Sequence, residues 1–407
     1  MLFRSQRLDD TELSLGANLL NSRGYNITTP ANVYSYNPDR DPYRDLGLSA
    51  RLVQHLADDQ QVGLQFLRSA SVVHFDSGAD YQGRLYDDLN RDRTQTLAAH
   101  WQGRLGAGVQ STLRLGRSWD QSTAEGAYPS VFATTQDQAS WLNQIALPGG
   151  TLSAGLEWLR QSIDSTSTFS VRSRDILGAL LGWHAHYGAL SVQADAREDH
   201  NSQFGNHATG QLGLAYQVNT AWRLRGSVGT AFKAPTFNDL YFSDAYGDHG
   251  NPDLKPERST STELGTDLTL DGLTLSATAF DNRIRDLIQW IETSPGSFTY
   301  VPQNTARARI QGLTLQAAGA LGADTRLRAS LTLQNPEDAV TGARLQRRAR
   351  QLAQLHVSHA LGALHLGTDL SWVGARYDSA TQAGATRMGG YGLVAVFANW
   401  RLSPDWA

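Results

Sequence analysis

The chain contains no cysteine among its 407 residues. This absence excludes disulfide scaffolds, cysteine-ligated zinc and cysteine nucleophiles, so any chemistry must rely on oxygen or imidazole groups. Charged residues are also sparse, at 18% of the chain against about 25% in typical soluble domains. Proline is scarce too, with 12 residues beside 38 glycines, a balance that favours many strands joined by tight turns.

Long apolar runs are missing as well. No stretch approaches the roughly 18 consecutive apolar residues of a membrane-spanning helix, whereas a β-barrel remains open because its strands alternate and escape hydropathy analysis. The net charge is only −4 and no basic block could follow a phosphate backbone, so we expect no nucleic-acid partner. Residues 1–7 lack the apolar core of a secretory signal, so any export signal is expected outside this chain.

Catalytic motifs are absent from the sequence. It holds no G-x-S-x-G, no H-E-x-x-H and no G-x-x-x-x-G-K. His184 and His186 would project from one face of a strand, where two imidazoles could share a metal, although a pair that faces a watery lumen is the simpler interpretation. We therefore expect that the protein is not an enzyme.

What the sequence does contain is period-two alternation, interrupted by short polar turns. One hairpin illustrates it, because alternating leucines run up to Asp271-Gly272, a strong two-residue turn signal, and resume after it. Pairing across this turn predicts an apolar face made of Leu270 with Leu273, Leu268 with Leu275, and Leu264 with Ala279. The opposite, polar face receives Thr269 with Thr274, Asp267 with Ser276, and Gly265 with Thr278.

The connections between strands are of two kinds. Short turns, such as residues 219–221 and 362–363, contrast with longer polar connections that we expect at 26–44, 76–93, 237–258 and 334–345. This asymmetry is typical of outer-membrane barrels, whose long loops face outward. The segments number about eighteen or nineteen, each of about ten residues, which predicts an all-β protein: one large antiparallel transmembrane β-barrel domain spanning residues 1–407. Side chains cannot fill so wide a lumen, which must hold water or a plug.

The tryptophans suit the same architecture. Trp119, Trp222 and Trp372 fall near expected strand ends, where an aromatic girdle would meet the lipid headgroups. The alternative is that they are core aromatics of a soluble sandwich, but sandwiches rarely have so many strands.

Two of the long connections are acidic. Asp39, Asp41 and Asp45 lie in the first, and the second holds Asp87, Asp88, Asn90 and Asp92. Such hard oxygen ligands suit calcium. The spacing from Asp88 to Asp92 matches the opening of an EF-hand loop, but Arg93 replaces the required glycine, so this is no EF-hand. Two interpretations remain: the loops share a calcium ion, or they are acidic because they are exposed to solvent.

The middle of the chain carries a distinctive pair of motifs. Residues 229–235 read G-T-A-F-K-A-P, and residues 250–257 read G-N-P-D-L-K-P-E. This order resembles the barrel signature of TonB-dependent outer-membrane receptors. A second match, N-x-x-x-A-x-I-x-G, begins at Asn304 and ends at Gly312, although Thr314 stands where the family commonly has glutamate.

Further segments resemble the cobalamin receptors of this family. Residues 345–350 read L-Q-R-R-A-R and are similar to an L-x-R-R-A-K strand, and residues 372–378 read W-V-G-A-R-Y-D. The resemblance implies calcium-ordered outer loops. By motif it points to Asp39 and Asp41 in N-P-D-R-D as metal ligands, with Asp76 and Asp92 as further partners. Asn26 stands where the family would offer another aspartate.

The resemblance also implies a location and a transport activity. We expect a barrel in the bacterial outer membrane, in contact with its lipid, that takes up cobalamin or a related corrinoid with energy from TonB. Judged against the family, the chain is a fragment of the roughly 22-stranded type, without the plug domain that contacts TonB and without closing strands. A siderophore receptor is the main alternative. A passive porin would not explain the paired motifs, and an outer-membrane hydrolase would normally have a smaller barrel with acidic or Ser/His residues at its rim.

Overall fold

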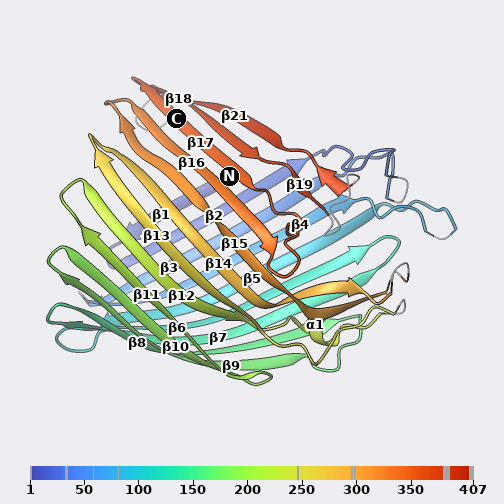
Figure 1. Ribbon diagram of the computed structural model, residues 1–407, viewed down its shortest axis with the longest axis horizontal. Coiled ribbons are helices and arrows are strands. Elements are labelled where there is room, and N and C mark those ends of the chain that lie inside the picture. The colour runs from blue at the N-terminus through green and yellow to red at the C-terminus, as the bar shows by residue number, and fades with distance from the viewer. Residues whose placement is uncertain are drawn as a thin grey trace.

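The computed structural model describes residues 2–32, 35–57, 59–80, 82–244, 247–294, 297, 299–378 and 386–402. Nineteen strands form one continuous antiparallel sheet that curls into a barrel wall (Figure 1). Among these residues, no helix is long and apolar enough to cross a membrane.

In chain order the elements are β1 (Leu2–Leu8), β2 (Thr11–Ser22), β3 (Tyr43–Ala57), β4 (Gln60–Phe75), β5 (Asp88–Arg104), β6 (Val109–Glu125), β7 (Ser130–Leu147), β8 (Gly150–Ser165), β9 (Ser173–Tyr187), β10 (Leu190–Asn201), β11 (Gly205–Gln217), β12 (Trp222–Lys233), α1 (Phe237–Tyr241), β13 (Glu257–Leu270), β14 (Leu273–Glu292), β15 (Tyr300–Leu321), β16 (Thr325–Asp338), β17 (Gln351–Leu361), β18 (Leu364–Val373), β19 (Arg376–Tyr377), β20 (Arg387–Met388) and β21 (Tyr391–Trp400).

The sheet is a simple meander. Each strand from β1 to β18 pairs with its neighbour in sequence, and β21 pairs with β18, while β19 and β20 form a separate small ribbon. Within the described part of the chain no pairing joins β1 to β21, so these two strands are the edges of the sheet. The all-β antiparallel architecture predicted from the sequence is confirmed.

The predicted hairpin register is also confirmed. Leu270 pairs with Leu273, Leu268 with Leu275, and Leu264 with Ala279, and the three polar pairs follow on the other face. Asp271 and Gly272 take positive φ angles of 46° and 84°. Positive φ at both central residues is what a two-residue turn needs to match the twist of the strands.

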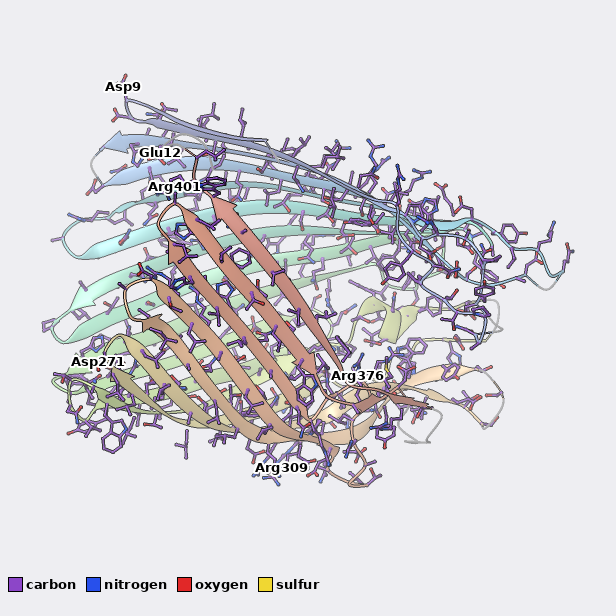
Figure 2. All side chains as sticks on the ribbon, turned by 90° about the horizontal axis from the view of Figure 1, so that it is seen from above. Asp9, Glu12, Asp271, Arg309, Arg376 and Arg401 are labelled. Atoms are coloured by element: carbon purple, nitrogen blue, oxygen red, sulfur yellow. The ribbon has the colours of Figure 1, made fainter. Side chains whose placement is uncertain are left out.

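Short turns and long connections lie at opposite ends of the barrel. Figure 2 shows Asp9, Asp271 and Arg401 at the short-turn end, and Arg309 and Arg376 at the other. The long connections are residues 23–42, 76–87, 234–256, 339–350 and 374–390. The strands are longer than expected, with 22 residues in β15, because they continue past the bilayer toward the long loops.

Two boundaries and one strand predicted from the sequence were wrong. Strand β5 already begins at Asp88, so the second connection is shorter than 76–93. Strand β16 continues to Asp338, so the last of the four predicted connections runs from 339 to 350 instead of 334 to 345. Residues 345–350 consequently lie in a loop and not on a strand. Arg347 has a φ of 58° there and pairs with Asp378 at 2.6 Å, a conformation that does not fit a strand.

The sheet has an apolar outer face and a polar lumen. Leu264, Leu268 and Leu270 are 67%, 36% and 51% exposed on the outer face, while Glu263 and Asp267 alternate with them toward the lumen. Trp222 opens β12 and Trp372 lies near the end of β18, as a girdle requires. Trp119 lies inside β6, in register with Arg68 through Gln95, at the level where the outer face becomes polar.

A small apolar cluster lies at the long-loop end. It comprises Ile163, Phe169 and Phe237, with Phe132, Tyr241 and Phe242 packed against it. The cluster anchors α1, the single helix of the described chain, to the strands β7 and β8 beneath it.

Candidate functional site

The connection between β2 and β3 folds back on itself and then contacts the next long connection, residues 76–87. Gly24 has a φ of 62°, and a Cβ at this position would clash with the carbonyl oxygen of Asp41. The Asp41 amide donates to the Tyr25 carbonyl at 3.3 Å, and the Ile27 amide donates to Asp41 Oδ2 at 2.8 Å. The two ends of the loop are therefore held together around Asp41, which is only 8% exposed.

Side chains then fasten this loop to the next one, residues 76–87. The Thr28 hydroxyl donates to Asp76 Oδ2. Asn37 Nδ2 donates to the Tyr86 carbonyl at 3.2 Å and to Asp39 Oδ2 at 3.0 Å. The Asn37 carbonyl accepts from Asn26 Nδ2 at 2.5 Å. Asn37 thus joins the two loops, a role that the sequence pattern did not reveal.

Three of the four predicted metal ligands meet where the loops join. Asp39, Asp41 and Asp76 each offer one carboxylate oxygen, and these atoms lie within 4.8 Å of one another. Asp76 Oδ1 is buried and has no hydrogen-bond partner. Burial and then the nearby carboxylates of Asp76 and Asp41 raise the pKa of Asp39. These hard oxygens, one of them unpaired, would suit a divalent cation such as calcium.

Asp92 does not join this cluster among the described residues. It lies on β5 opposite Ser71 and Ser122, on the lumen side of the wall. The other acids of the second connection also have local partners. Asp88 is 3% exposed and accepts from the Ser77 hydroxyl at 2.6 Å, and Asp87 contacts His74 at 2.7 Å. A role of Asp92 as ligand stays a prediction, as does calcium itself.

Asp80 organises the second loop. It accepts from the backbone amides of Arg84 and Gln82 at 2.9 and 2.8 Å, and from Tyr86 Oη at 3.0 Å. These hydrogen bonds, that of the Arg84 amide foremost, lower the pKa of Asp80 to about 2. Sequence reasoning missed Asp80, although an aspartate followed three residues later by Gly83, whose φ is 76°, is a recognisable turn signal.

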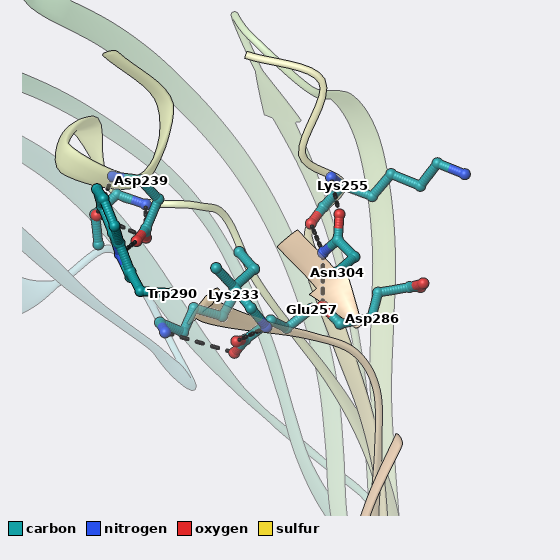
Figure 3. A network of polar contacts seen from close by, with 9 residues as sticks. Lys233, Asp239, Lys255, Glu257, Asp286, Trp290 and Asn304 are labelled. Atoms are coloured by element: carbon teal, nitrogen blue, oxygen red, sulfur yellow. Dashed lines mark hydrogen bonds and ion pairs between the residues drawn. The ribbon is translucent and has the colours of Figure 1, made fainter. Parts of the chain in front are cut away.

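The two signature motifs form a second polar network, shown in Figure 3. Glu257, buried at the start of β13, accepts from the Ile288 amide at 2.9 Å and contacts Lys233 Nζ at 3.5 Å. The F-K-A-P and N-P-x-L-x-P-E segments are therefore joined through a carboxylate that also holds β14. This arrangement is architectural, since it fixes the loop between β12 and β13.

Asn304 extends the network to β15. Its Oδ1 accepts from the Lys255 amide at 2.8 Å, and its Nδ2 donates to the carbonyls of Lys255 and Asp286 at 2.9 and 2.7 Å. Helix α1 is fixed nearby by a capping box between Thr236 and Asp239, and Trp290 Nε1 donates to Asp239 at 3.0 Å (Figure 3). Asn304, which begins the N-x-x-x-A-x-I-x-G motif, thus hydrogen-bonds to the backbone of the G-N-P-D-L-K-P-E segment.

The histidine pair lies in the lumen wall, as the simpler interpretation predicted. The rings of His184 and His186 are 5.0 Å apart on β9, and His186 Nδ1 lies 2.9 Å from Ser191 Oγ. His184 lines a shallow cavity of about 190 Å³ together with Gln193, Arg225 and Glu263. These side chains make the barrel interior polar.

A wide antiparallel wall that is apolar outside and polar inside, with long loops at one end, defines an outer-membrane β-barrel. A family model described as "TonB dependent receptor-like, beta-barrel" matches residues 4–407. The chain therefore belongs to the TonB-dependent receptor family, whose members are transporters of the bacterial outer membrane and not enzymes. The family predicted from the motifs is confirmed.

Similar proteins include two vitamin B12 transporters named BtuB. The chain is 31% identical over 291 residues to that of Vibrio vulnificus strain YJ016, which covers 70% of this chain and 46% of the relative. It is 28% identical over 381 residues to that of Photobacterium profundum, which covers 91% and 60%. The chain thus spans about half of the length of these relatives.

Solved structures show the same fold at lower identity. The siderophore receptor PirA of Acinetobacter baumannii matches with a TM-score of 0.80 at 17% identity, covering 97% of this chain and 70% of that one. The ferric enterobactin receptor PfeA of Pseudomonas aeruginosa, in a mutant bound to enterobactin, matches with a TM-score of 0.79 at 16% identity, covering 98% and 70%.

Proposed function

We propose that this chain is the barrel of a receptor that takes up cobalamin or a related corrinoid across the outer membrane. The observation that carries the proposal is the cluster of Asp39, Asp41 and Asp76, where two outward loops meet and three carboxylates lie close enough to share a divalent cation. The names of the similar transporters support the same ligand.

In this proposal a calcium ion orders the ligand-binding loops. The three aspartates would hold it, and the ion would supply the positive charge that offsets their repulsion. Fastening the loops would also fix the apolar side chains that they expose. Tyr25, Ile27 and Leu85 are 76%, 54% and 48% exposed there, an amphipathic surface suited to a large ring ligand.

Release of the ligand would require energy. A barrel wide enough for a corrinoid cannot stand open without leaking, so passage must be gated and then driven. We propose that TonB supplies the drive through a plug domain that occupies the polar lumen. The barrel wall itself performs no covalent chemistry in this scheme.

A siderophore receptor is the second candidate. The fold likeness to PirA and PfeA, at 17% and 16% identity, is compatible with it but supports the fold alone. The similar transporters named for vitamin B12, at 31% and 28% identity, favour the corrinoid over this second candidate.

Calorimetric titration of cyanocobalamin into the complete receptor tests the proposal. We expect tight binding in calcium that weakens at least about tenfold in EGTA, because the loops lose the ion that joins them. A ferric siderophore titrated under the same conditions is the matched control. Binding of the siderophore without any heat from cyanocobalamin would contradict the corrinoid proposal and leave the family assignment intact.

A further inference from the structure

The outer face of β3 to β6 carries an apolar groove of about 390 Å³ near the short-turn end. Its wall includes Leu52, Leu64, Ala99 and Leu115, which form one row across the four strands. Leu64 and Leu115 are 52% and 51% exposed, so the row faces the lipid. Trp101 and Leu113 line the next row of the groove toward the turns.

The same face changes character toward the long loops. Alternation places four exposed arginines there, which we call the arginine patch: Arg44 on β3, Arg68 on β4, and Arg91 and Arg93 on β5. Arg44 and Arg91 both lie opposite Val72, Arg93 lies opposite Ala70, and Arg68 lies opposite Leu48 and Gln95. The patch therefore occupies three neighbouring strands, directly beyond the apolar rows.

The charges of this patch are largely uncompensated. Arg91 pairs with Glu125 at 2.7 Å, whereas Arg44, Arg68 and Arg93 form no ion pair with any carboxylate in the part of the chain that the structure describes. An outward arginine on the adjoining strand β6 differs in this respect, because Arg117 pairs with Asp137 at 2.6 Å.

Patch and groove are spaced like the two parts of an amphiphile. Arg68 lies four positions along the strand from Leu64, and Arg93 lies six positions from Ala99, which corresponds to about 13–20 Å along a strand. Phe66 and Leu97, exposed at 36% and 50%, cover the interval. Because the strands of such barrels are tilted by about 35–45°, this corresponds to roughly 10–15 Å of depth, which fits within one leaflet of the roughly 30 Å hydrocarbon core.

We propose that the arginine patch and the groove together bind one phosphorylated lipid of the outer leaflet. The phosphate lies against Arg44, Arg68 and Arg93, and an acyl chain lies in the groove between Leu64 and Leu115. Guanidinium groups suit this headgroup because they bind phosphate in a bidentate manner. The long loops mark this end of the barrel as the outward one, so the lipid belongs to the outer leaflet. The site lies outside the lumen and does not depend on which ligand is transported.

Native mass spectrometry of the complete receptor in detergent tests the proposal. The probes are dimyristoyl phosphatidic acid, dimyristoyl phosphatidylcholine with the same chains, and inorganic phosphate. We expect phosphatidic acid to bind at least about tenfold more tightly than either of the others, because it alone offers both an exposed phosphate and acyl chains. Equal binding of the two lipids, or of inorganic phosphate and phosphatidic acid, would overturn the proposal.

Variants locate the site. Arg68→Gln/Arg93→Gln should abolish the preference for phosphatidic acid, and Ala99→Trp, which fills the groove, should weaken both lipids. The matched control is Arg160→Gln/Arg283→Gln, because these outward arginines have carboxylate partners, Asp175 at 3.9 Å and Asp281 at 2.8 Å. All variants are first checked for the heat-modifiable mobility of a folded barrel. Loss of the preference in the control pair, or its survival in the first pair, would refute the assignment.

Discussion

At the scale of single residues, the carboxylates of Asp39, Asp41 and Asp76 repel one another unless a cation lies between them. Within this cluster, Asp76 Oδ1 is buried without a hydrogen-bond partner, while its Oδ2 accepts from the Thr28 hydroxyl and the Asn37 amide. Asp39 and Asp41 add two more charges within 4.8 Å. Unit charges at about this distance interact by roughly 4 kcal/mol at the surface of a protein, so removing one carboxylate should matter measurably.

We therefore predict that Asp76→Asn weakens calcium binding by roughly ten- to a hundredfold, as measured by calorimetric titration of calcium into the complete receptor. Asp92→Asn is the control, because Asp92 faces the lumen and lies outside the cluster. An unchanged affinity in Asp76→Asn would rule out this cation site. A comparable loss in Asp92→Asn would instead show that Asp92 is a ligand, as the sequence resemblance implied.

The raised pKa of Asp39 leads to a further prediction about single residues. Because that pKa is raised above 3.8, the proton on Asp39 stabilises the folded loop at low pH, and this contribution is lost as pH rises through the raised pKa. Calcium competes with the same proton. Its affinity should therefore rise as pH increases through the raised pKa of Asp39 and then level off, and Asp39→Asn should flatten this acid part of the curve.

The low pKa of Asp80 allows the pH dependence of calcium binding to be distinguished from unfolding of the second loop, residues 76–87. Its pKa is lowered to about 2, so its contribution to stability is present above 3.8 and is lost only as pH falls through about 2. The second loop should thus keep its form throughout a series of calcium titrations above about pH 4. A calcium affinity independent of pH in this range would contradict the assignment of Asp39.

At the scale of elements, Asn304 joins three segments that are distant in sequence: the loop before β13, the bulge in β14 and the strand β15. We predict that Asn304→Ala destabilises the receptor by about 1–3 kcal/mol, because two backbone carbonyls and one amide lose their partner. The measurement is the thermal midpoint by circular dichroism in detergent, with Asn21→Ala on the exposed face of β2 as control. Equal midpoints for both variants would show that the network is dispensable.

The elements also show what could be predicted from the sequence. The hairpin at Asp271-Gly272 was predictable to the residue, because alternation fixes the register and the turn type fixes the loop length. Strand ends near the long loops were not, because β5 continues past the bilayer, where polar residues such as Asp92 and Asn90 replace apolar alternation. The short helix α1 escaped notice, although its capping box from Thr236 to Asp239 is a readable signal.

The candidate site was predictable in part. The resemblance singled out Asp39, Asp41, Asp76 and Asp92, and the structure brings the first three together. Asn37 and Thr28 could not be found in this way, because neutral side chains that join two loops leave no periodicity or spacing in the sequence. Their role depends on how the first loop folds back at Gly24, which is a property of tertiary structure.

At the scale of the whole molecule, the two edge strands of the sheet, β1 and β21, each leave one row of backbone hydrogen-bonding groups without a strand partner in the described chain. Strand β21 pairs with β18 on one side, and its outer side presents unpaired backbone groups beside Val394 and Val396, which are 68% and 80% exposed. Unpaired amides and carbonyls cannot be solvated in a bilayer, so an open edge is costly there. The central strands β5 to β8 have partners on both sides.

Amide hydrogen exchange of the 407-residue chain, refolded in detergent, should therefore be graded along the sheet. We predict that β21 exchanges within the dead time of mixing, because its backbone can open without breaking two ladders, whereas β5 to β8 remain protected for orders of magnitude longer. The matched comparison is the same chain at increasing concentration. Protection of β21 that grows with concentration would show that edges of two copies pair. Strong protection in a dilute monomer would mean that β1 and β21 meet, and it would contradict the open sheet.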